Sequence, residues 1–426
     1  MPATVVEKIL ARACGKTVVK AGEVVEARVD LAMSHENAAL VIDRFLNIYE
    51  GTGLDPQVWD PQKIAIVFDH RVPAESSKTA TNQGIIRRFV KEQAISKFHD
   101  IRGDQGGICH QVLPESGYVR PGNVIVGSDS HTTSHGALGA FAFGIGATEM
   151  ACVWALGSVL NVRVPNTIKV IVRGQFGDFV SPKDLVLNLV GRLTAQGANF
   201  SVIEFHGETI RAMSIGGRLT ICNMTVEAGA TSGIVPADEN TADYLREAGA
   251  DGDVDFVLPD RDAVYDQVLE MDVSGLSPQI ACPHSVDNVK PVEEVDDTSI
   301  DQIVIGSCTN GRLEDIKIAA DILRGKKVAF STRVLVFPAS AKIYQQALTL
   351  GYFKDLVESG AVIMNPGCGS CLGVHQGALG DGEKALATTN RNFEGRMGNP
   401  NAEVFLCSPA VAACSAIRGK ITNPRK

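Results

Sequence analysis

Three cysteines stand where their thiolates could bind a metal group. Cys368 and Cys371 form a Cys-x-x-Cys pair in NPGCGSC, and Cys308 lies upstream in GSCTN. A Cys-x-x-Cys pair alone is more often a redox pair or half of a zinc site. Three thiolates are one short of a closed tetrahedral zinc site, and no second Cys-x-x-Cys or Cys-x-x-His completes one. The set instead suits a 4Fe-4S cluster in which one iron has no protein ligand and can act as a Lewis acid.

The other cysteines give no comparable pattern. Because no export signal precedes them, the ten cysteines are expected to be reduced thiols or ligands rather than a disulfide framework. The seven outside the set sit mostly among apolar or small neighbours and are expected to be small buried hydrophobic side chains: Cys14, Cys109, Cys152, Cys222, Cys282, Cys407 and Cys414.

Histidines beside acidic or amide residues offer general acid-base chemistry. His70 follows Asp69 directly, His131 closes the run SDSH, and His110 stands in GGICHQ. A lone histidine is usually structural. A histidine with a carboxylate partner beside a metal suits proton transfer, because the carboxylate fixes the tautomer and holds the pKa near working pH.

These groups share a position at the ends of predicted strands. Four apolar runs end in polar clusters, at residues 69–70, 128–131, 307–310 and 368–371. Ligands bind at the carboxyl ends of strands in open α/β sheets, so the four clusters could converge on one crevice. The alternative for each cluster is that its Asp, Ser and Asn residues are helix N-caps or turn formers.

Two arginines could hold an anionic substrate. Arg391 and Arg396 lie in NRNFEGR, in a chain whose overall charge is acidic, and arginine forks bind carboxylates through two parallel hydrogen bonds. Surface salt bridges are the alternative. The Gly-rich block 136–149 holds no complete dinucleotide fingerprint, and close packing explains its glycines better.

The segments that must position these residues alternate between strand and helix. Runs such as KIAIVFDH (63–70) and QIVIGSCTN (302–310) predict buried strands, and segments 82–98 and 312–325 have helical spacing. This alternation predicts an α/β protein with mostly parallel sheets covered on both faces.

Three α/β domains are predicted, at residues 1–165, 166–290 and 291–426. The first boundary lies where the Gly-rich apolar block gives way to a new strand, and the second lies in the acidic, Pro-bearing stretch 277–299. The last domain carries the three cysteines.

Composition excludes several classes of protein. The chain is 45% hydrophobic and 21% charged, which is ordinary for a globular protein, and its net charge of -9 disfavours nucleic acid as a partner. Its longest apolar stretch, 150–162, is shorter than the roughly 20 residues needed to cross a bilayer. Glu7 and Lys8 interrupt any secretory apolar region. A cytoplasmic protein without a membrane or nucleic-acid partner is expected.

Four long strings resemble the aconitase family. These are GSDSHTTSHGALGAFAFGIGATEMA (127–151), GSCTNGRLEDI (306–316), NPGCGSCLG (365–373) and NRNFEGRMGNP (390–400), and the resemblance runs along almost the whole chain. It is strongest to the large subunits of 3-isopropylmalate dehydratase and homoaconitase. The resemblance implies aconitase-type α/β domains and a reversible hydro-lyase that moves a hydroxyl between adjacent carbons of a 2-hydroxy di- or tricarboxylate.

The resemblance also implies roles for individual residues. One 4Fe-4S cluster would be held by Cys308, Cys368 and Cys371, with one iron not ligated by the protein. His70 beside Asp69 falls at the position thought to protonate the leaving hydroxyl. The remaining matches imply two polar pairs, three contacts to substrate and two asparagines near the cluster: His110 with Asp129, His131 with Glu227; Ser130, Arg391 and Arg396; Asn223 and Asn390.

Two departures from full-length aconitases bear on activity. Those enzymes continue into a mobile swivel domain that brings the serine base for the carbon-bound proton, whereas this sequence ends at Lys426. A separate small subunit is therefore expected to supply that domain. His35 stands about where aconitases carry a substrate-binding glutamine, which weakens citrate as the substrate.

The sequence leaves open both the substrate and the functional class of the protein. 3-Isopropylmalate in leucine biosynthesis is the expected substrate, with homoaconitate or methylated malates as alternatives. A non-catalytic metal or redox module built on the Cys-x-x-Cys pair is the alternative from a different class. A protein that senses iron through RNA contacts, as some family members do, is disfavoured by the net charge of -9.

Overall fold

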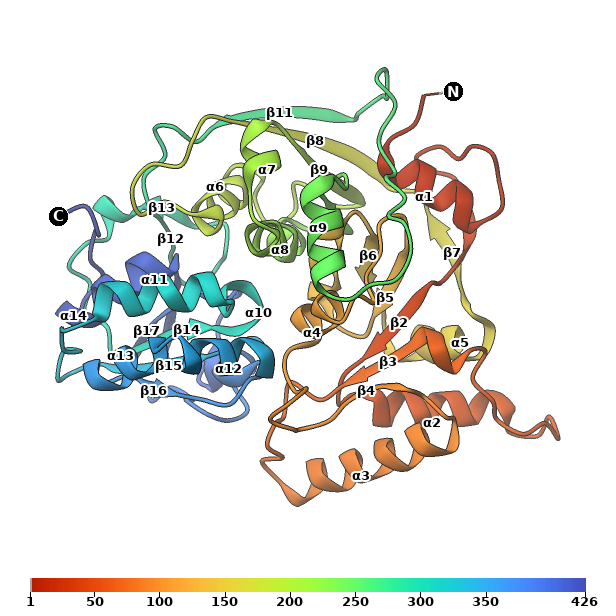
Figure 1. The fold of residues 1–426 in the computed structure, drawn as a ribbon, viewed down its shortest axis with the longest axis horizontal. Helices are drawn as coiled ribbons and strands as arrows, with labels where there is room; N and C mark the ends of the chain where they lie inside the picture. The colour runs from red at the N-terminus through yellow and green to blue at the C-terminus, as the bar shows by residue number, and fades with distance from the viewer. Residues whose placement is uncertain (1) are drawn as a thin grey trace.

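The computed structural model describes residues 2–426, which form three parallel or mainly parallel sheets and a small two-stranded ribbon. In Figure 1 the five-stranded sheet lies at the lower right, the seven-stranded sheet at the left, and the long strands of the four-stranded sheet run across the top between them. The α/β class with mostly parallel sheets, predicted from the alternating pattern, is confirmed.

The five-stranded sheet is parallel throughout. Its order is β4-β3-β2-β5-β6, and β2, β3 and β5 are buried along their whole length, as expected for strands covered on both faces. Its strands are β2 (Leu31–Ser34), β3 (Ile64–Val67), β4 (Lys97–His99), β5 (Val124–Gly127) and β6 (Phe141–Gly144). The accompanying helices are α1 (Val5–Ala13), α2 (Ala38–Tyr49), η1 (Pro61–Lys63), α3 (Ser77–Glu92), α4 (Cys109–Glu115), η2 (Ser130–Leu138) and α5 (Ala147–Leu156).

An antiparallel ribbon leads into the four-stranded sheet. The ribbon pairs β1 (Val24–Arg28) with β7 (Ser158–Arg163), and the parallel sheet has the order β10-β9-β8-β11. Its strands are β8 (Asn166–Arg173), β9 (Ser201–His206), β10 (Ser232–Ile234) and β11 (Gln267–Asp272). Its helices are α6 (Pro182–Leu193), α7 (Glu208–Ala212), α8 (Ile215–Asn223), η3 (Met224–Ala228) and α9 (Glu239–Glu247).

The seven-stranded sheet is parallel except at one end. Its order is β13-β12-β18-β17-β14-β15-β16, and β12 runs antiparallel to both of its neighbours. Its strands are β12 (Gln279–Ala281), β13 (Val289–Pro291), β14 (Gln302–Gly306), β15 (Arg333–Phe337), β16 (Val362–Ile363), β17 (Lys384–Ala387) and β18 (Glu403–Leu406). Its helices are η4 (Val292–Glu294), α10 (Ser307–Asn310), α11 (Leu313–Leu323), α12 (Ala341–Thr349), α13 (Tyr352–Ser359), η5 (Gly369–Leu372), η6 (Arg396–Gly398) and α14 (Pro409–Arg418).

One of three hydrophobic clusters spans all three sheets. A single cluster of buried side chains includes Val67 of β3, Val170 of β8 and Val304 of β14. The strands β12 and β13 pair within the seven-stranded sheet, which joins residues 279–291 to the segments that follow. The division at residues 165 and 290 stays a prediction, because packing is continuous across all three sheets. Among residues 2–426, no helix combines the length and apolarity needed to span a bilayer.

The Gly-rich block owes its glycines to close backbone contacts. A Cβ added at Gly136 in η2 would lie 1.7 Å from the carbonyl oxygen of Gly233 in β10, and one added at Gly144 would lie 2.7 Å from the carbonyl oxygen of Asp129. Neither neighbour is a flexible side chain that could move aside. This block therefore presses β6 and η2 against the polar segment that follows β5.

Gly136→Ala is expected to destabilise the protein by about 2 kcal/mol or more, because overpacking against fixed backbone typically costs 1–3 kcal/mol. Gly84 in α3 is the matched control, since an added Cβ there meets nothing within 4 Å. Gly84→Ala should be neutral or stabilising by up to about 1 kcal/mol. Calorimetric unfolding of both variants checks this, and equal transition temperatures would contradict the packing argument.

Candidate active site

Strand ends from two sheets bring the sequence-predicted polar clusters together. Asp69 and His70 follow β3, and residues 128–131 follow β5. Cys308 lies two residues beyond the end of β14. The backbone N–H of Cys368 donates to the Asp69 carbonyl oxygen at 2.8 Å, which joins the Cys-x-x-Cys segment to the end of β3. The structure thus brings the predicted polar clusters to one region.

A hydrogen-bonded series of carboxylate and histidine side chains runs through this region. Asp69 Oδ1 lies 2.6 Å from His70 Nδ1, and His70 Nε2 lies 3.2 Å from Asp129 Oδ2. The other oxygen of Asp129 lies 2.9 Å from His110 Nε2 and accepts the backbone N–H of His131 at 2.7 Å. His110 therefore meets Asp129 as the sequence resemblance implied, and Asp129 also contacts His70.

The electrostatic environment of this series of side chains favours their charged forms. Burial alone would lower the pKa of His70, but the charges and hydrogen bonds of Asp69 and Asp129 outweigh it and raise that pKa well above its usual value. Burial would raise the pKa of Asp129, but His110, His131 and His70 outweigh it and hold that pKa well below its usual range. The two carboxylates beside His70 thus favour its protonated form.

A second polar group joins His131 to an arginine. Glu227 Oε1, on η3, lies 2.8 Å from His131 Nε2 and accepts from Arg391 Nε at 2.8 Å. Arg391 also donates to Ser130 Oγ at 2.9 Å. These bonds use two of the five N–H groups of the guanidinium, so the remaining donors can bind an anion. The structure thus brings together three distant segments of the chain, which carry Ser130 and His131, Glu227, and Arg391.

His35 lies against the histidine that carries the raised pKa. Its ring stacks on that of His70 with centroids 4.2 Å apart. Glu36, which the sequence reasoning missed, accepts the backbone N–H groups of His70 and Arg71 at 3.0–3.1 Å. The only sequence signal for Glu36 is that it is an acidic residue directly after His35. A cleft of about 470 Å³ opens here and is lined by His35, Glu36, Asn37, His70, Arg71, Ser76, Lys78, Thr79, Asn82, Asp129 and Leu372.

The turn before Cys308 is backbone-strained. Ser307 has φ +65°, and a Cβ added at Gly306 would lie 2.0 Å from the Phe337 carbonyl oxygen. Non-glycine residues held in the left-handed region concentrate at functional sites. This sharp turn aims the buried Cys308 away from β14 and toward the two asparagines described next.

Two asparagines and an arginine surround the cysteine sulfurs. Asn390 Nδ2 lies 3.2 Å from Cys308 Sγ, and its Oδ1 lies 3.7 Å from Cys371 Sγ. Asn223 Nδ2 lies 3.4 Å from Cys308 Sγ, and an Nη of Arg396 lies 3.1 Å from Cys371 Sγ. A hydrogen bond from Cys368 and the charge of Arg396 hold the pKa of the Cys371 thiol well below its usual range, in spite of burial.

The three-cysteine region fits a group larger than one metal ion. Around one tetrahedral zinc ion, sulfurs would lie about 3.8 Å apart. Within residues 2–426, three or more ligand atoms lie within 4.8 Å of one another only in the group of His35, Glu36, Asp69 and His70. At least one pair among the three cysteine sulfurs therefore lies farther apart than the ligands of a single tetrahedral ion would.

Unsatisfied polar atoms gather beside the same cysteines. Ser307 Oγ, Ser370 Oγ and Arg396 Nε are buried and have no hydrogen-bond partner. Buried polar atoms normally have partners, so these three are free to bind a group held beside the cysteines. All ten cysteines are free, and the seven outside the set are buried or half-buried.

Comparisons with known proteins agree along the whole chain. The model of the aconitase family (aconitate hydratase) matches residues 7–299 and 288–419. The chain is 52% identical over 426 residues to a probable 3-isopropylmalate dehydratase large subunit of Methanothermobacter thermautotrophicus, covering 100% of this chain and 99% of that protein. It is 47% identical over 420 residues to a probable methanogen homoaconitase large subunit of the same organism, covering 99% and 97%.

A solved structure shares the fold. The holo-form of aconitase X from Thermococcus kodakaraensis superposes with a TM-score of 0.51 at 15% identity, covering 91% of this chain and 89% of that one. The match of the family model to nearly the whole chain, with a relative about half identical over its full length, makes this protein a member of the aconitase family.

Proposed function

We propose that the chain is the large subunit of a two-subunit iron-sulfur hydro-lyase that interconverts 2-hydroxy di- or tricarboxylates, with 3-isopropylmalate as the substrate. The observation that carries the proposal is the hydrogen-bonded series around His70 and Asp129. It lies beside three cysteines, of which Cys308 and Cys371 have asparagine or arginine N–H donors at their sulfurs. The relatives named as 3-isopropylmalate dehydratase large subunits support the choice of substrate.

The cofactor we propose is one 4Fe-4S cluster held by Cys308, Cys368 and Cys371. When bound, such a cluster supplies one iron without a protein ligand, which acts as a Lewis acid toward a substrate hydroxyl. Asn223 and Asn390 donate to the sulfur of Cys308 and would keep the ligand geometry fixed. Arg396 does the same at Cys371.

His70 is the proposed acid that protonates the leaving hydroxyl. Its raised pKa supplies a proton at neutral pH, and Asp69 and Asp129 stabilise the charged ring before transfer. Asp69 is itself fixed by the backbone N–H of Cys109, which donates to its Oδ2 at 2.8 Å. The acid is thus held by groups that cannot rotate away.

Arg391, Arg396 and Ser130 are the proposed contacts to substrate carboxylates, with His35 beside the acid as a further contact. Glu227 fixes both Arg391 and His131, so the cationic fork keeps one orientation. A base for the carbon-bound proton must lie on the face opposite the acid. We propose that a small subunit carrying the swivel domain supplies it, which the "large subunit" names of the relatives support.

Homoaconitate is the second candidate substrate, because a relative named methanogen homoaconitase large subunit is 47% identical. We also propose a cytoplasmic location, which ten free cysteines support.

The proposal predicts activity only from the assembled pair. Anaerobically reconstituted chain should hydrate isopropylmaleate when the small subunit of the same organism is added, and should turn over poorly alone. Homoaconitate and dimethylmaleate are assayed in parallel. Activity on homoaconitate alone would make homoaconitate the substrate in place of 3-isopropylmalate. A cluster-loaded pair that is inactive on all three compounds would overturn the assignment.

Cys371→Ser should lose most of the iron bound per chain, because a proposed ligand is removed. Cys407→Ser is the matched control, since Cys407 is also buried but its closest described charged neighbours are Lys183 and Asp184. Iron and sulfide analysis after anaerobic reconstitution measures both. Equal iron content in the two variants would refute the ligand assignment.

Asp69→Asn should move the basic limb of the pH-activity profile to lower pH. The charge of Asp69 raises the pKa of His70, so the variant loses the proton of His70 at a lower pH than the parent does. Asp100→Asn is the control, because Asp100 pairs with Arg87 instead. A basic limb that stays in place in Asp69→Asn, measured in the assembled enzyme, would remove His70 from the role of acid.

A further inference from the structure

Three lysine or arginine side chains are buried among residues 2–426, and two of them differ from the third. Arg218 forms a two-point ion pair with Asp238, at 2.6 and 2.8 Å. Lys183 and Arg312 have no carboxylate oxygen within 4.0 Å of their side-chain nitrogens anywhere in that range. An unpaired buried cation is strongly unfavourable, so each of these two needs an explanation.

Both unpaired cations bind backbone carbonyls of the cysteine region. Arg312 donates to the carbonyl oxygens of Cys308 and Thr309 at 2.9 and 2.7 Å. Lys183 donates to the carbonyl oxygen of Thr388 at 2.8 Å and to that of Thr389, directly before Asn390. One cation thus holds the segment of a proposed ligand, and the other holds the segment whose amide lies between two of the cysteine sulfurs.

The positions of the two cations add to their cost. Lys183 is in the first turn of α6, and Arg312 is the N-cap residue of α11. The helix dipole disfavours a positive charge at a helix N-terminus. The same first turns carry acidic residues, Asp184 on α6 and Glu314 and Asp315 on α11, but none of these carboxylates forms an ion pair with the cation on its helix.

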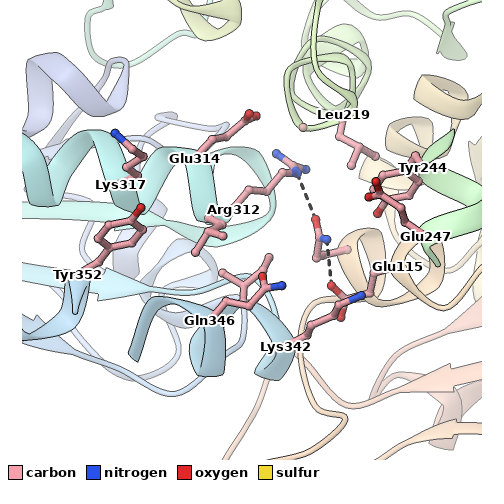
Figure 2. Close-up of a pocket in the computed structure, with 14 residues that line it drawn as sticks. Glu115, Leu219, Tyr244, Glu247, Arg312, Glu314, Lys317, Lys342, Gln346 and Tyr352 are labelled. Carbon is pink, nitrogen blue, oxygen red and sulfur yellow. Dashed lines mark hydrogen bonds between the residues drawn. The ribbon is translucent and has the colours of Figure 1, made fainter. Parts of the chain in front are cut away.

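The surroundings of Arg312 confirm that no carboxylate neutralises it directly. Its Nε donates to Gln111 Oε1 at 3.1 Å, and Gln111 Nε2 in turn donates to Glu115 Oε2 at 3.0 Å. Figure 2 shows this row of contacts, with Arg312 reaching across the wall of a cavity of about 470 Å³ and Glu115 at the far end. Asp315 accepts the backbone N–H of Arg312 rather than its guanidinium.

Thiols and carboxylates both act on the charge of Lys183, and no carboxylate contacts its ammonium group directly. Burial lowers the pKa of Lys183 to about 8, and the groups that act against this are Cys407, Cys308, Asp184 and Asp315. The carboxylate of Asp184 is taken up by the backbone N–H groups of Ser181 and Gln279. Cys308, a proposed ligand of the cluster, is thus one of the groups whose negative charge would stabilise the charged form of Lys183.

We propose that Lys183 and Arg312 are positioning residues whose charges balance the negative charge of the thiolate-ligated group held by Cys308, Cys368 and Cys371. They act through the Cys308 and Thr388–Asn390 segments and touch neither substrate nor the sulfurs. The inference rests on the proposed function only in that an iron-sulfur cluster is the group bound. Residues behind metal ligands commonly change metal affinity 10- to 100-fold.

The test compares Arg312→Gln and Lys183→Gln with Arg218→Gln, a buried cation of the same class that is paired elsewhere. Each full-length variant is reconstituted anaerobically, and iron loss to a chelator is followed at equal folded fraction. The two proposed variants should lose iron about 10- to 100-fold faster than the parent. Arg218→Gln should lower thermal stability without a matching increase in the rate of iron loss.

The reduction potential of the cluster is the readout that a merely structural role would not move. Removing a nearby cation should shift the potential to more negative values, because reduction adds negative charge. Arg312→Lys keeps the charge, so its potential should stay near that of the parent even though one fork geometry is lost. If Arg312→Gln does not fold, the same measurements are made on Lys183→Gln and Arg312→Lys.

The outcomes separate this inference from the proposed function. Iron loss and potential equal to those of Arg218→Gln, in a parent that holds its cluster, would overturn the charge-balancing role alone. A parent that takes up no cluster would overturn both. A parent that holds its cluster, with the expected shifts in the variants but no activity on any of the three substrates, would support this inference and overturn the substrate assignment.

Discussion

The site depends on one half-buried carboxylate that is shared by several histidines. Asp129 contacts His70 and His110 through its side chain and accepts the backbone N–H of His131. These partners come from the segment that follows β3, from α4 and from η2, so one acidic side chain joins three parts of the chain. Because Asp129 is charged and largely shielded, each partner stays in place only while the others also do.

The same low exposure organises the cysteine side of the site. The sulfurs receive N–H donors from Asn223, Asn390 and Arg396, and polar atoms beside them have no partner of their own. Such a region is incomplete as a protein interior, since buried donors without acceptors are unfavourable. Donors directed at sulfur stabilise negative charge there. The acid side and the cysteine side are joined at Asp69, whose carbonyl accepts from Cys368 while its carboxylate holds His70.

Fold and site are linked through continuous packing of the sheets. The Gly-rich block places η2 directly against β10, with Gly136 facing the Gly233 carbonyl at a distance that no side chain tolerates. This contact carries His131 toward Glu227, which lies on the other sheet's η3. Small residues therefore have a positional role here: they let two layers approach closely enough for an ion pair between them.

The sequence by itself determined the strand-helix alternation, the polar strand ends and the family, because β-branched runs and long motifs are local patterns. It identified the residue types of the site, including His70, Asp129 and the three cysteines. Only the tertiary structure decided that Asp129 is shared by His70 and His110, that Glu36 holds the backbone of His70, and that Lys183 and Arg312 lie unpaired behind the cysteine segments. These are contacts between residues distant in the chain. Their identity depends on how sheets pack, and no local periodicity records which buried charge meets which partner.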